Sequence, residues 1–276
     1  MPGMNSAEPG STPIHEHNRR AWDARAKAEL RFAKPIGDNE FAAATKELEN
    51  DPWLAGAIRG RRLLCLGSGG GRQSVLYAAC GASVTVIDIS AEMLSLDRQA
   101  AAARGLVVTC VQASIDNLSA LPAASFDTVV HPVSTCYVPD VTAVYREASR
   151  VTVPGGLYIS QHKQPTSLQA DFHPLPRGGY EITAPYYRTA PLPAVSGSSH
   201  REEGTLEFLH RWEDLLGALC RAGFVIEDLA EPLHARPDAE RGSFAHRSQF
   251  VAPYVRIKAR RVGTPQSGRG AILVPE

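Results

Sequence analysis

The chain has 276 residues, 43% of them apolar and 21% charged, and 29 Lys and Arg balance 29 Asp and Glu. A chain of this length buries on the order of three quarters of its unfolded surface as one body, so it needs no disulfide or metal to fold. Zero net charge argues against a nucleic-acid-binding protein, because phosphate affinity depends on clustered basic residues. No apolar run approaches the ~20 residues of a membrane-spanning helix. Without a signal-peptide pattern, and with five cysteines lacking a CxxC pair, we expect a cytoplasmic protein.

The order of patterns along the chain predicts one main domain with additions. We expect residues 1–13 to be disordered, and helices over 14–33 and 39–49 to form an N-terminal helical cap at 14–60. Apolar strands then alternate with helices, which predicts a parallel sheet covered on both faces. This main domain spans 61–261, is interrupted by an irregular Pro/Tyr-rich insertion at 164–205, and resumes with a helix from Leu206. Residues 262–276 form a loose C-terminal tail.

The strongest local signal is a glycine loop between the first expected strand and the next helix. The loop contains Gly67, Gly69 and Gly71, and the second strand ends at Asp88. Glycines let the backbone pass close to a ligand, and the following helix offers free N–H groups to an anionic group. In this arrangement the acid at the end of the second strand binds the hydroxyls of a ribose. The pattern therefore predicts a nucleoside site, with a tight turn and a solvated Asp as the alternative.

The kind of nucleoside follows from the residue after the loop. A dinucleotide fingerprint requires Gly or Ala where this chain has Arg72. The Gly-x-Gly-x-Gly pattern instead resembles that of class I S-adenosylmethionine-dependent methyltransferases. DISAEML at 88–94, SFDTVVHPVSTCYVPD at 125–140 and EASRVTVPGGLYIS at 147–160 resemble segments of the ubiquinone/menaquinone-type, "type 11" methyltransferase domain. The resemblance implies an α/β, Rossmann-like three-layer sandwich whose seven-stranded sheet is mostly parallel with the last strand antiparallel, under an N-terminal helical lid.

The resemblance also implies S-adenosyl-L-methionine as the cofactor and assigns residues to it. In this sequence they are Trp22, Cys65, Gly67, Ser68, Gly69, Gln73, Asp88, Ile89, Met93, Ser114, Ile115 and His131. Asn18 and Trp22 look like part of the helix that closes over the cofactor in relatives. Cys65 and Ser114 stand where the family usually has carboxylates. Gln73 is our candidate for compensating the loss at the methionine end, and Asp116 is the candidate substitute for the carboxylate replaced by Ser114.

Methyl transfer from a sulfonium needs orientation and no metal, and it needs a base only when the acceptor is un-ionised. His131 and His162 end two strands, where ligands bind in open α/β sheets, and His173 lies in the insertion. We therefore expect these three histidines as catalytic candidates, a structural role being the alternative for each. For the substrate we expect contacts from Tyr137, His162, His173 and Tyr186.

These observations predict transfer of a methyl group from S-adenosylmethionine to a small organic acceptor, with O-, N- and C-methylation left open. We expect a monomer or homodimer without nucleic-acid, membrane or metal partners. Two alternatives stay open: an NAD-dependent oxidoreductase on a Rossmann sheet, and a catalytically silent S-adenosylmethionine-binding regulatory module. The replaced carboxylates at Cys65 and Ser114 keep the second alternative open.

Overall fold

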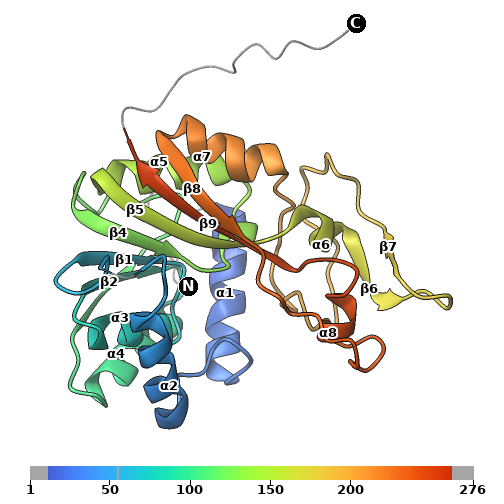
Figure 1. Ribbon diagram of the computed structural model, residues 1–276, viewed down its shortest axis with the longest axis horizontal. Helices are drawn as coiled ribbons and strands as arrows, with labels where there is room; N and C mark the ends of the chain where they lie inside the picture. The colour runs from blue at the N-terminus through green and yellow to red at the C-terminus, as the bar shows by residue number, and fades with distance from the viewer. Residues whose placement is uncertain (1–11, 55, 263–276) are drawn as a thin grey trace, which may run out of the picture.

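The computed structural model describes residues 12–54 and 56–262, which form a seven-stranded sheet with helices on both faces (Figure 1). In spatial order the strands are β3 (Val108–Gln112), β2 (Ser83–Asp88), β1 (Arg62–Leu66), β4 (Phe126–His131), β5 (Thr152–Lys163), β9 (Tyr254–Arg261) and β8 (Phe224–Ala230). β9 is antiparallel to both of its neighbours, and the other strands are parallel to one another. The expected mostly parallel, seven-stranded sheet with its last strand reversed is confirmed.

The sheet buries apolar side chains on both faces because residues along a strand point alternately to either side. In β1, Leu64 and Leu66 pack in one cluster, and Leu63 and Cys65 pack in another; all four are fully buried. The helices are α1 (Pro13–Lys27), α2 (Asp38–Glu49), α3 (Gln73–Ala79), α4 (Ala91–Ala102), α5 (Val141–Val151), α6 (Pro165–Gln169), α7 (Ala218–Arg221) and α8 (Phe244–Arg247). The first cluster includes α5 and α7, and the second includes α3 and α4.

The first helix is shorter than the sequence predicts. It ends at Lys27 instead of continuing to Ala33. Glu29 and Phe32 both have a positive φ, which turns the chain back on itself. The turn buries Ala33 in a small cluster with Met93 of α4. Packing of this apolar residue against α4 therefore overrides the helical tendency of the segment.

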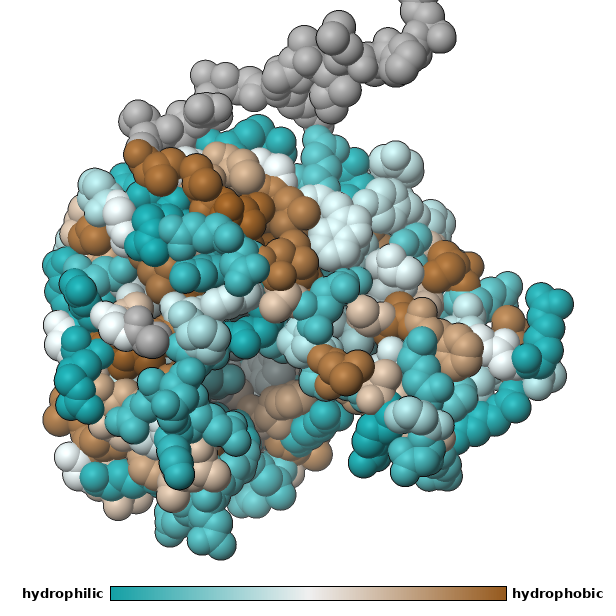
Figure 2. Space-filling view, viewed as in Figure 1, coloured by the Kyte–Doolittle hydropathy of each residue, from teal (hydrophilic) through white to brown (hydrophobic). Residues whose placement is uncertain are grey.

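The insertion is more regular than expected. It contains α6 and a two-stranded ribbon of β6 (Ala170–Pro174) and β7 (Tyr180–Ile182). With α8 these elements form a smaller part at one side of the sheet (Figure 1). The space-filling view is hollowed between this part and the part that carries α2, α3 and α4 (Figure 2).

The helix expected from Leu206 begins later, with a π-helical turn at Glu213–Gly217 that continues into α7. The preceding residues are extended because their backbone bonds to other segments: Phe208 N donates to Cys136 O at 2.7 Å, and Glu207 O accepts from Leu192 N at 2.7 Å. Tertiary hydrogen bonds therefore replace the first helical turns. The expectations for residues 1–11 and 263–276 lie outside the described residues.

Candidate functional site

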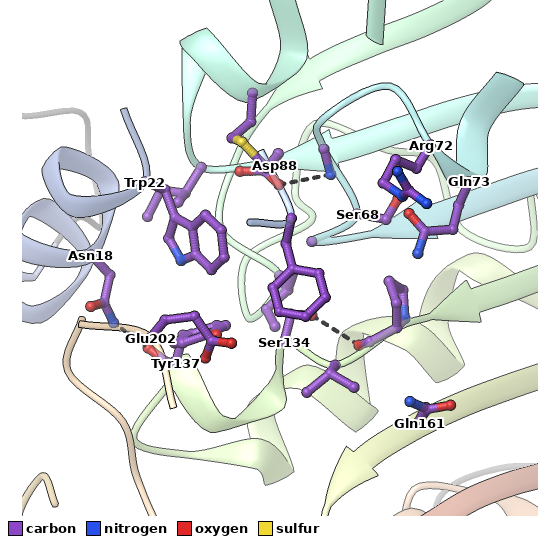
Figure 3. A pocket seen from close by; sticks show the side chains of 18 of the residues that line it. Asn18, Trp22, Ser68, Arg72, Gln73, Asp88, Ser134, Tyr137, Gln161 and Glu202 are labelled. Atoms are coloured by element: carbon purple, nitrogen blue, oxygen red, sulfur yellow. Dashed lines mark hydrogen bonds between the residues drawn. The ribbon is translucent and has the colours of Figure 1, made fainter. Parts of the chain in front are cut away.

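A cavity of about 640 Å³ opens where the parallel strands of the sheet end. Its lining comes from α1 and the segment after it, the loops after β1, β2, β3 and β4, the start of α3, the end of β5, the insertion, and the segments around β8 and β9. Figure 3 shows part of this wall, with Asn18 and Trp22 of α1 and Gln161 of β5 among the labelled residues. The lining residues are His15, Asn18, Trp22, Arg31, Phe32, Gly67, Ser68, Gly69, Arg72, Gln73, Asp88, Ile89, Met93, Ser114, Ile115, Pro132, Val133, Ser134, Tyr137, Val138, Gln161, Glu202, His234, Phe244 and Tyr254. This is the edge at which open α/β sheets bind ligands.

The glycine loop at the end of β1 passes too close to its neighbours for side chains. A Cβ on Gly67, whose φ is +55°, would lie 2.6 Å from Ser134 Oγ. A Cβ on Gly69 would lie 2.7 Å from Met93 Cβ and 2.8 Å from Asp88 Oδ2. The loop therefore brings the ends of β1, β2 and β4 together around the cavity.

The carboxylate of Asp88 is fixed by two backbone amides. Its Oδ2 accepts from Gly69 N at 3.0 Å and its Oδ1 accepts from Ser90 N at 2.9 Å. Burial raises the pKa of Asp88 to about 6, against the opposing effect of these hydrogen bonds. Each carboxylate oxygen can accept more than one hydrogen bond, so the side chain can still receive the two hydroxyls of a ribose.

Helix α1 covers the cavity and is held there by polar contacts along its length. Asn18 Nδ2 donates to Tyr137 O and Leu206 O, at 2.8 and 3.0 Å, and Asn18 Oδ1 accepts from Leu206 N at 2.8 Å. Trp22 lies one helical turn later and meets Tyr137 edge-on, with ring centroids 5.4 Å apart. Asp23 accepts from Ser90 Oγ at 2.6 Å. The helix is therefore a lid whose inner face belongs to the site.

A buried carboxylate that the sequence reasoning missed supports the glycine loop. Asp97 of α4 accepts from Gly70 N at 2.9 Å and from the hydroxyl of Ser74 in α3. Burial raises the pKa of Asp97 to about 7. The available signal was helical spacing, since Asp97 stands on the same face as the buried residues Met93 and Ala100.

A second missed feature is a buried cluster of charges beside the cavity. Lys163 Nζ donates to Glu202 Oε2 at 2.6 Å and to Glu207 Oε1 at 2.9 Å, and Arg201 Nε donates to Glu207 Oε2 at 2.6 Å. Tyr137 Oη donates to Glu202 Oε2 at 2.6 Å. Burial acts to raise the pKa of Glu202, but the charge of Lys163 and the hydrogen bonds lower it overall. The cluster therefore places an ionised Glu202 carboxylate in the cavity wall.

Most residues expected to bind the cofactor lie together in the cavity. They are Trp22, Gly67, Ser68, Gly69, Gln73, Asp88, Ile89, Met93, Ser114 and Ile115. Cys65 does not line it, because its side chain is fully buried in the apolar cluster that includes α3 and α4. The acid considered as a substitute for the missing second carboxylate, Asp116, is also not in the lining; its Oδ2 pairs with His15 Nε2 at 3.0 Å. Among the described residues, therefore, neither Cys65 nor Asp116 contributes to the cavity lining.

Two histidines expected near the acceptor are enclosed in the core instead. His131 is fully buried, with Nδ1 2.8 Å from Tyr158 Oη and Nε2 2.7 Å from Ser134 Oγ. His162 is equally buried and bonds the hydroxyls of Thr135 and Ser160. Burial lowers the pKa of His131 to about 3 and that of His162 well below its usual value. Both rings are therefore neutral structural residues behind the cavity wall, and the geometry does not support them as bases.

The other two acceptor-side expectations also fall outside the cavity. The His173 side chain is 75% exposed and lies 3.3 Å from Asp171. Tyr186 packs against the small cluster of Leu168, Leu192 and Leu209, and its hydroxyl accepts from Trp212 N at 3.3 Å. The irregular appearance of the insertion gave no means of placing these side chains. Of the residues expected to bind substrate, only Tyr137 lines the cavity.

The site fits a nucleoside cofactor. The glycine loop leaves no room for side chains beside Asp88, and the buried hydroxyl of Ser68 has no hydrogen-bond partner among the described residues. A carboxylate ending β2, a glycine turn ending β1 and a reversed β9 in a seven-stranded sheet define the fold of class I methyltransferases. Within the described ranges, no group of three or more His, Cys, Asp or Glu side chains is arranged to hold a metal ion.

Comparison with known proteins identifies the family. A methyltransferase-domain family model matches residues 64–160. The uncharacterized methyltransferase YbaJ of Bacillus subtilis is 32% identical over 228 residues, covering 78% of this chain and 89% of that protein. The chain belongs to this family, the class I S-adenosylmethionine-dependent methyltransferases of the type 11 domain. The alternative of an NAD-dependent oxidoreductase is therefore wrong.

Other relatives match over a shorter stretch or at lower identity. The ubiquinone biosynthesis O-methyltransferase of Xanthomonas euvesicatoria is 36% identical over 104 residues, which cover 37% of this chain and 44% of that enzyme. Among solved structures, a methyltransferase from Mesorhizobium loti has a TM-score of 0.60 at 24% identity, covering 77% of this chain and 99% of the other. A geranyl diphosphate C-methyltransferase from Streptomyces coelicolor has a TM-score of 0.61 at 18% identity, covering 93% and 100%. These structures share the fold.

Proposed function

We propose that the cavity holds S-adenosylmethionine at its β1–β2 end and a small organic acceptor at its β5–β9 end. The observation that carries this proposal is the pair of Gly69 and Asp88, joined by a 3.0 Å hydrogen bond in the wall of one large cavity. In this division Asp88 binds the ribose, and Ile89, Met93 and Ile115 provide the apolar surface for the adenine. Gly67, Ser68 and Gln73 surround the methionine part.

S-adenosylmethionine, when bound, supplies a methyl group on a positively charged sulfur. The chain's own residues position it: the glycine loop admits the ligand, Asp88 orients it, and α1 with Trp22 excludes water from above. Such positioning is the main source of catalysis in a displacement that needs no metal. Exclusion of water also protects the transferable group from side reactions.

The acceptor end has a different composition. Gln161, Glu202, His234, Phe244 and Tyr254 line it, from β5, the insertion, the loop after β8, α8 and β9. We assign 61–261 to the methyltransferase domain, 14–60 to the cap that covers its cofactor, and 164–205 to the insertion that shapes the acceptor end. A cavity with aromatic walls and a few polar groups suits a small molecule.

The relatives limit how far the acceptor can be named. The match to the ubiquinone biosynthesis O-methyltransferase of Xanthomonas euvesicatoria spans 44% of that enzyme, and the structural relatives include a C-methyltransferase. Both support a small-molecule acceptor for this chain. The acceptor atom has to be argued from the cavity itself.

A thermal-shift titration tests the proposal. S-adenosylhomocysteine should raise the melting temperature of the full chain in a concentration-dependent way, because a ligand that binds only the folded state stabilises it. NAD at the same concentrations should produce no shift. A shift with NAD alone, or no shift with S-adenosylhomocysteine at high micromolar concentration, would overturn the proposal.

A further inference from the structure

Three ring side chains form one wall at the acceptor end of the cavity. His234 lies in the loop after β8, Phe244 begins α8 and Tyr254 begins β9. The His234 ring meets each of the others edge-on, with centroids 5.4 Å apart. Because β8 is parallel to β5, this loop leaves the sheet at the same edge as the turns of Gly67 and Asp88.

One ring nitrogen of His234 is left without a hydrogen bond within the described part of the chain. Its Nε2 is buried and has no hydrogen-bond partner among the described residues. The other histidine and the carboxylates of the cavity wall already have hydrogen-bond partners within the protein. His15 pairs with Asp116, Asp88 accepts from two amides, and Glu202 binds Lys163 and Tyr137. A buried nitrogen left unpaired in a ligand cavity indicates that a ligand supplies the partner.

The protonation state of the ring suits a proton acceptor. Burial lowers the pKa of His234, so the imidazole is neutral at neutral pH and has a lone pair to offer. Glu202 is a much weaker base, because the charge of Lys163 and its hydrogen bonds lower its pKa to about 2. Of the two, only His234 is suited to remove a proton from a hydroxyl during a reaction.

We propose that His234 is the general base of the methyl transfer and that the acceptor is a hydroxyl on a planar ring packed against Phe244 and Tyr254. This inference rests on the proposed function. In the step, the O–H bond of the acceptor breaks and its proton moves to a ring nitrogen of His234. The oxygen's electron pair forms the bond to the methyl carbon, and the carbon–sulfur bond breaks with its electrons remaining on sulfur. His234 then releases the proton to water.

The surroundings of His234 select this acceptor class. Aromatic side chains pack favourably against a planar ring, edge-on or offset. A ring hydroxyl is largely un-ionised at neutral pH and gains from a base, whereas a thiolate or a neutral amine is already nucleophilic. The wall therefore combines the packing surface and the proton acceptor that a phenolic substrate requires.

A coloured probe tests the base directly. The probe is 4-nitrocatechol, whose ionised form absorbs at longer wavelength than its neutral form, added with excess S-adenosylhomocysteine at a pH below the probe's own pKa. The wild type should bind it and produce the band of the ionised form, because His234 takes the proton. His234→Gln should bind it without that band. His246→Gln is the matched control: this histidine bonds Tyr180 Oη at 2.8 Å and does not line the cavity, so its variant should behave as wild type.

Two results would overturn the inference. One is an equal band in His234→Gln; the other is no binding of the probe to the wild-type complex. Calorimetry with S-adenosylhomocysteine on the same three proteins separates this failure from failure of the proposed function, because cofactor binding should be unchanged in all of them. As a second readout, transfer of labelled methyl to catechol should fall about 100-fold or more in His234→Gln. Transfer to 4-nitrocatechol should fall less, because that probe ionises more readily.

Discussion

Asp97 in α4 accepts a hydrogen bond from the Gly70 amide at 2.9 Å, so a buried carboxylate outside the cavity holds the glycine loop in place. Burial raises the pKa of Asp97 to about 7, above that of an unfolded Asp, so the folded protein retains a proton that the unfolded chain loses. Stability from this group is therefore lost as pH rises from about 4 to about 7.

Asp97→Asn removes this titration while still offering an oxygen to Gly70. The unfolding free energy of the wild type, measured relative to that of Asp97→Asn in urea, should decline with rising pH by at most about 1.4 kcal/mol per pH unit. Asp88 titrates in the same direction in both proteins, and its charge also acts to raise the pKa of Asp97, so the difference includes the interaction between the two acids. If the difference in unfolding free energy between the wild type and Asp97→Asn stayed constant from about pH 4 to about pH 7, the raised pKa of Asp97 would be wrong.

Gly69→Ala should weaken S-adenosylhomocysteine binding by roughly tenfold or more, which is about 1.4 kcal/mol. The added Cβ would meet Asp88 Oδ2 at 2.8 Å and displace the carboxylate. Gly37→Ala is the matched control, since a Cβ there has nothing within 4 Å and its φ is not positive. Isothermal calorimetry on both variants makes the comparison. Equal affinities would show that the loop does not bind the cofactor.

Asn18→Ala should loosen α1 from the rest of the protein. Asn18 is buried and makes three hydrogen bonds to the backbone of Tyr137 and Leu206. Leaving buried backbone groups unpaired costs about 1–3 kcal/mol each. Hydrogen exchange in α1 should therefore become faster in this variant and stay unchanged in Arg20→Ala, whose side chain is 71% exposed on the same helix. Identical hydrogen-exchange rates in the two variants would show that Asn18 does not hold α1 in place.

The pair of Lys163 and Glu202 should be strongly coupled. Removing either partner from a buried ion pair costs about 3–5 kcal/mol, because the other charge is left uncompensated. The double variant Lys163→Met/Glu202→Gln should cost clearly less than the sum of the single variants in urea unfolding. The exposed pair Lys34 and Glu29, at 4.0 Å, is the control and should show less than about 1 kcal/mol. If the losses of unfolding free energy in the two single variants added up to the loss in the double variant, the proposed coupling of Lys163 and Glu202 would be wrong.

Local sequence patterns predict the sheet and most of the residues that line the β1–β2 end of the cavity. Strand, glycine loop and terminal acid follow one another in the chain, so Gly67, Gly69 and Asp88 are placed by their own neighbours. The acceptor half depends on contacts between distant segments. Glu202 reaches the cavity because Lys163, 39 positions earlier, binds it. His234 reaches it because β9 inserts between β5 and β8, which no local pattern specifies.

The histidines illustrate the same limit. His131 ends β4 as the strand pattern predicts, yet its ring faces Tyr158 and Ser134 in the core. The position of a strand end places the backbone but leaves the direction of the side chain to its packing partners.

Within the described residues, no helix is long and apolar enough to cross a membrane.

The most direct test of the central claim is calorimetric titration of S-adenosylhomocysteine into the wild type and Asp88→Ala. Asp88 is the only acid that both ends a strand and lines the cavity among the described residues. Hydrogen bonds to a charged group contribute about 1.5–3 kcal/mol, so the variant should bind roughly 10- to 100-fold more weakly. Circular dichroism on both proteins checks that the fold is retained. Wild-type affinity in Asp88→Ala, or no binding to the wild type at high micromolar concentration, would contradict the account.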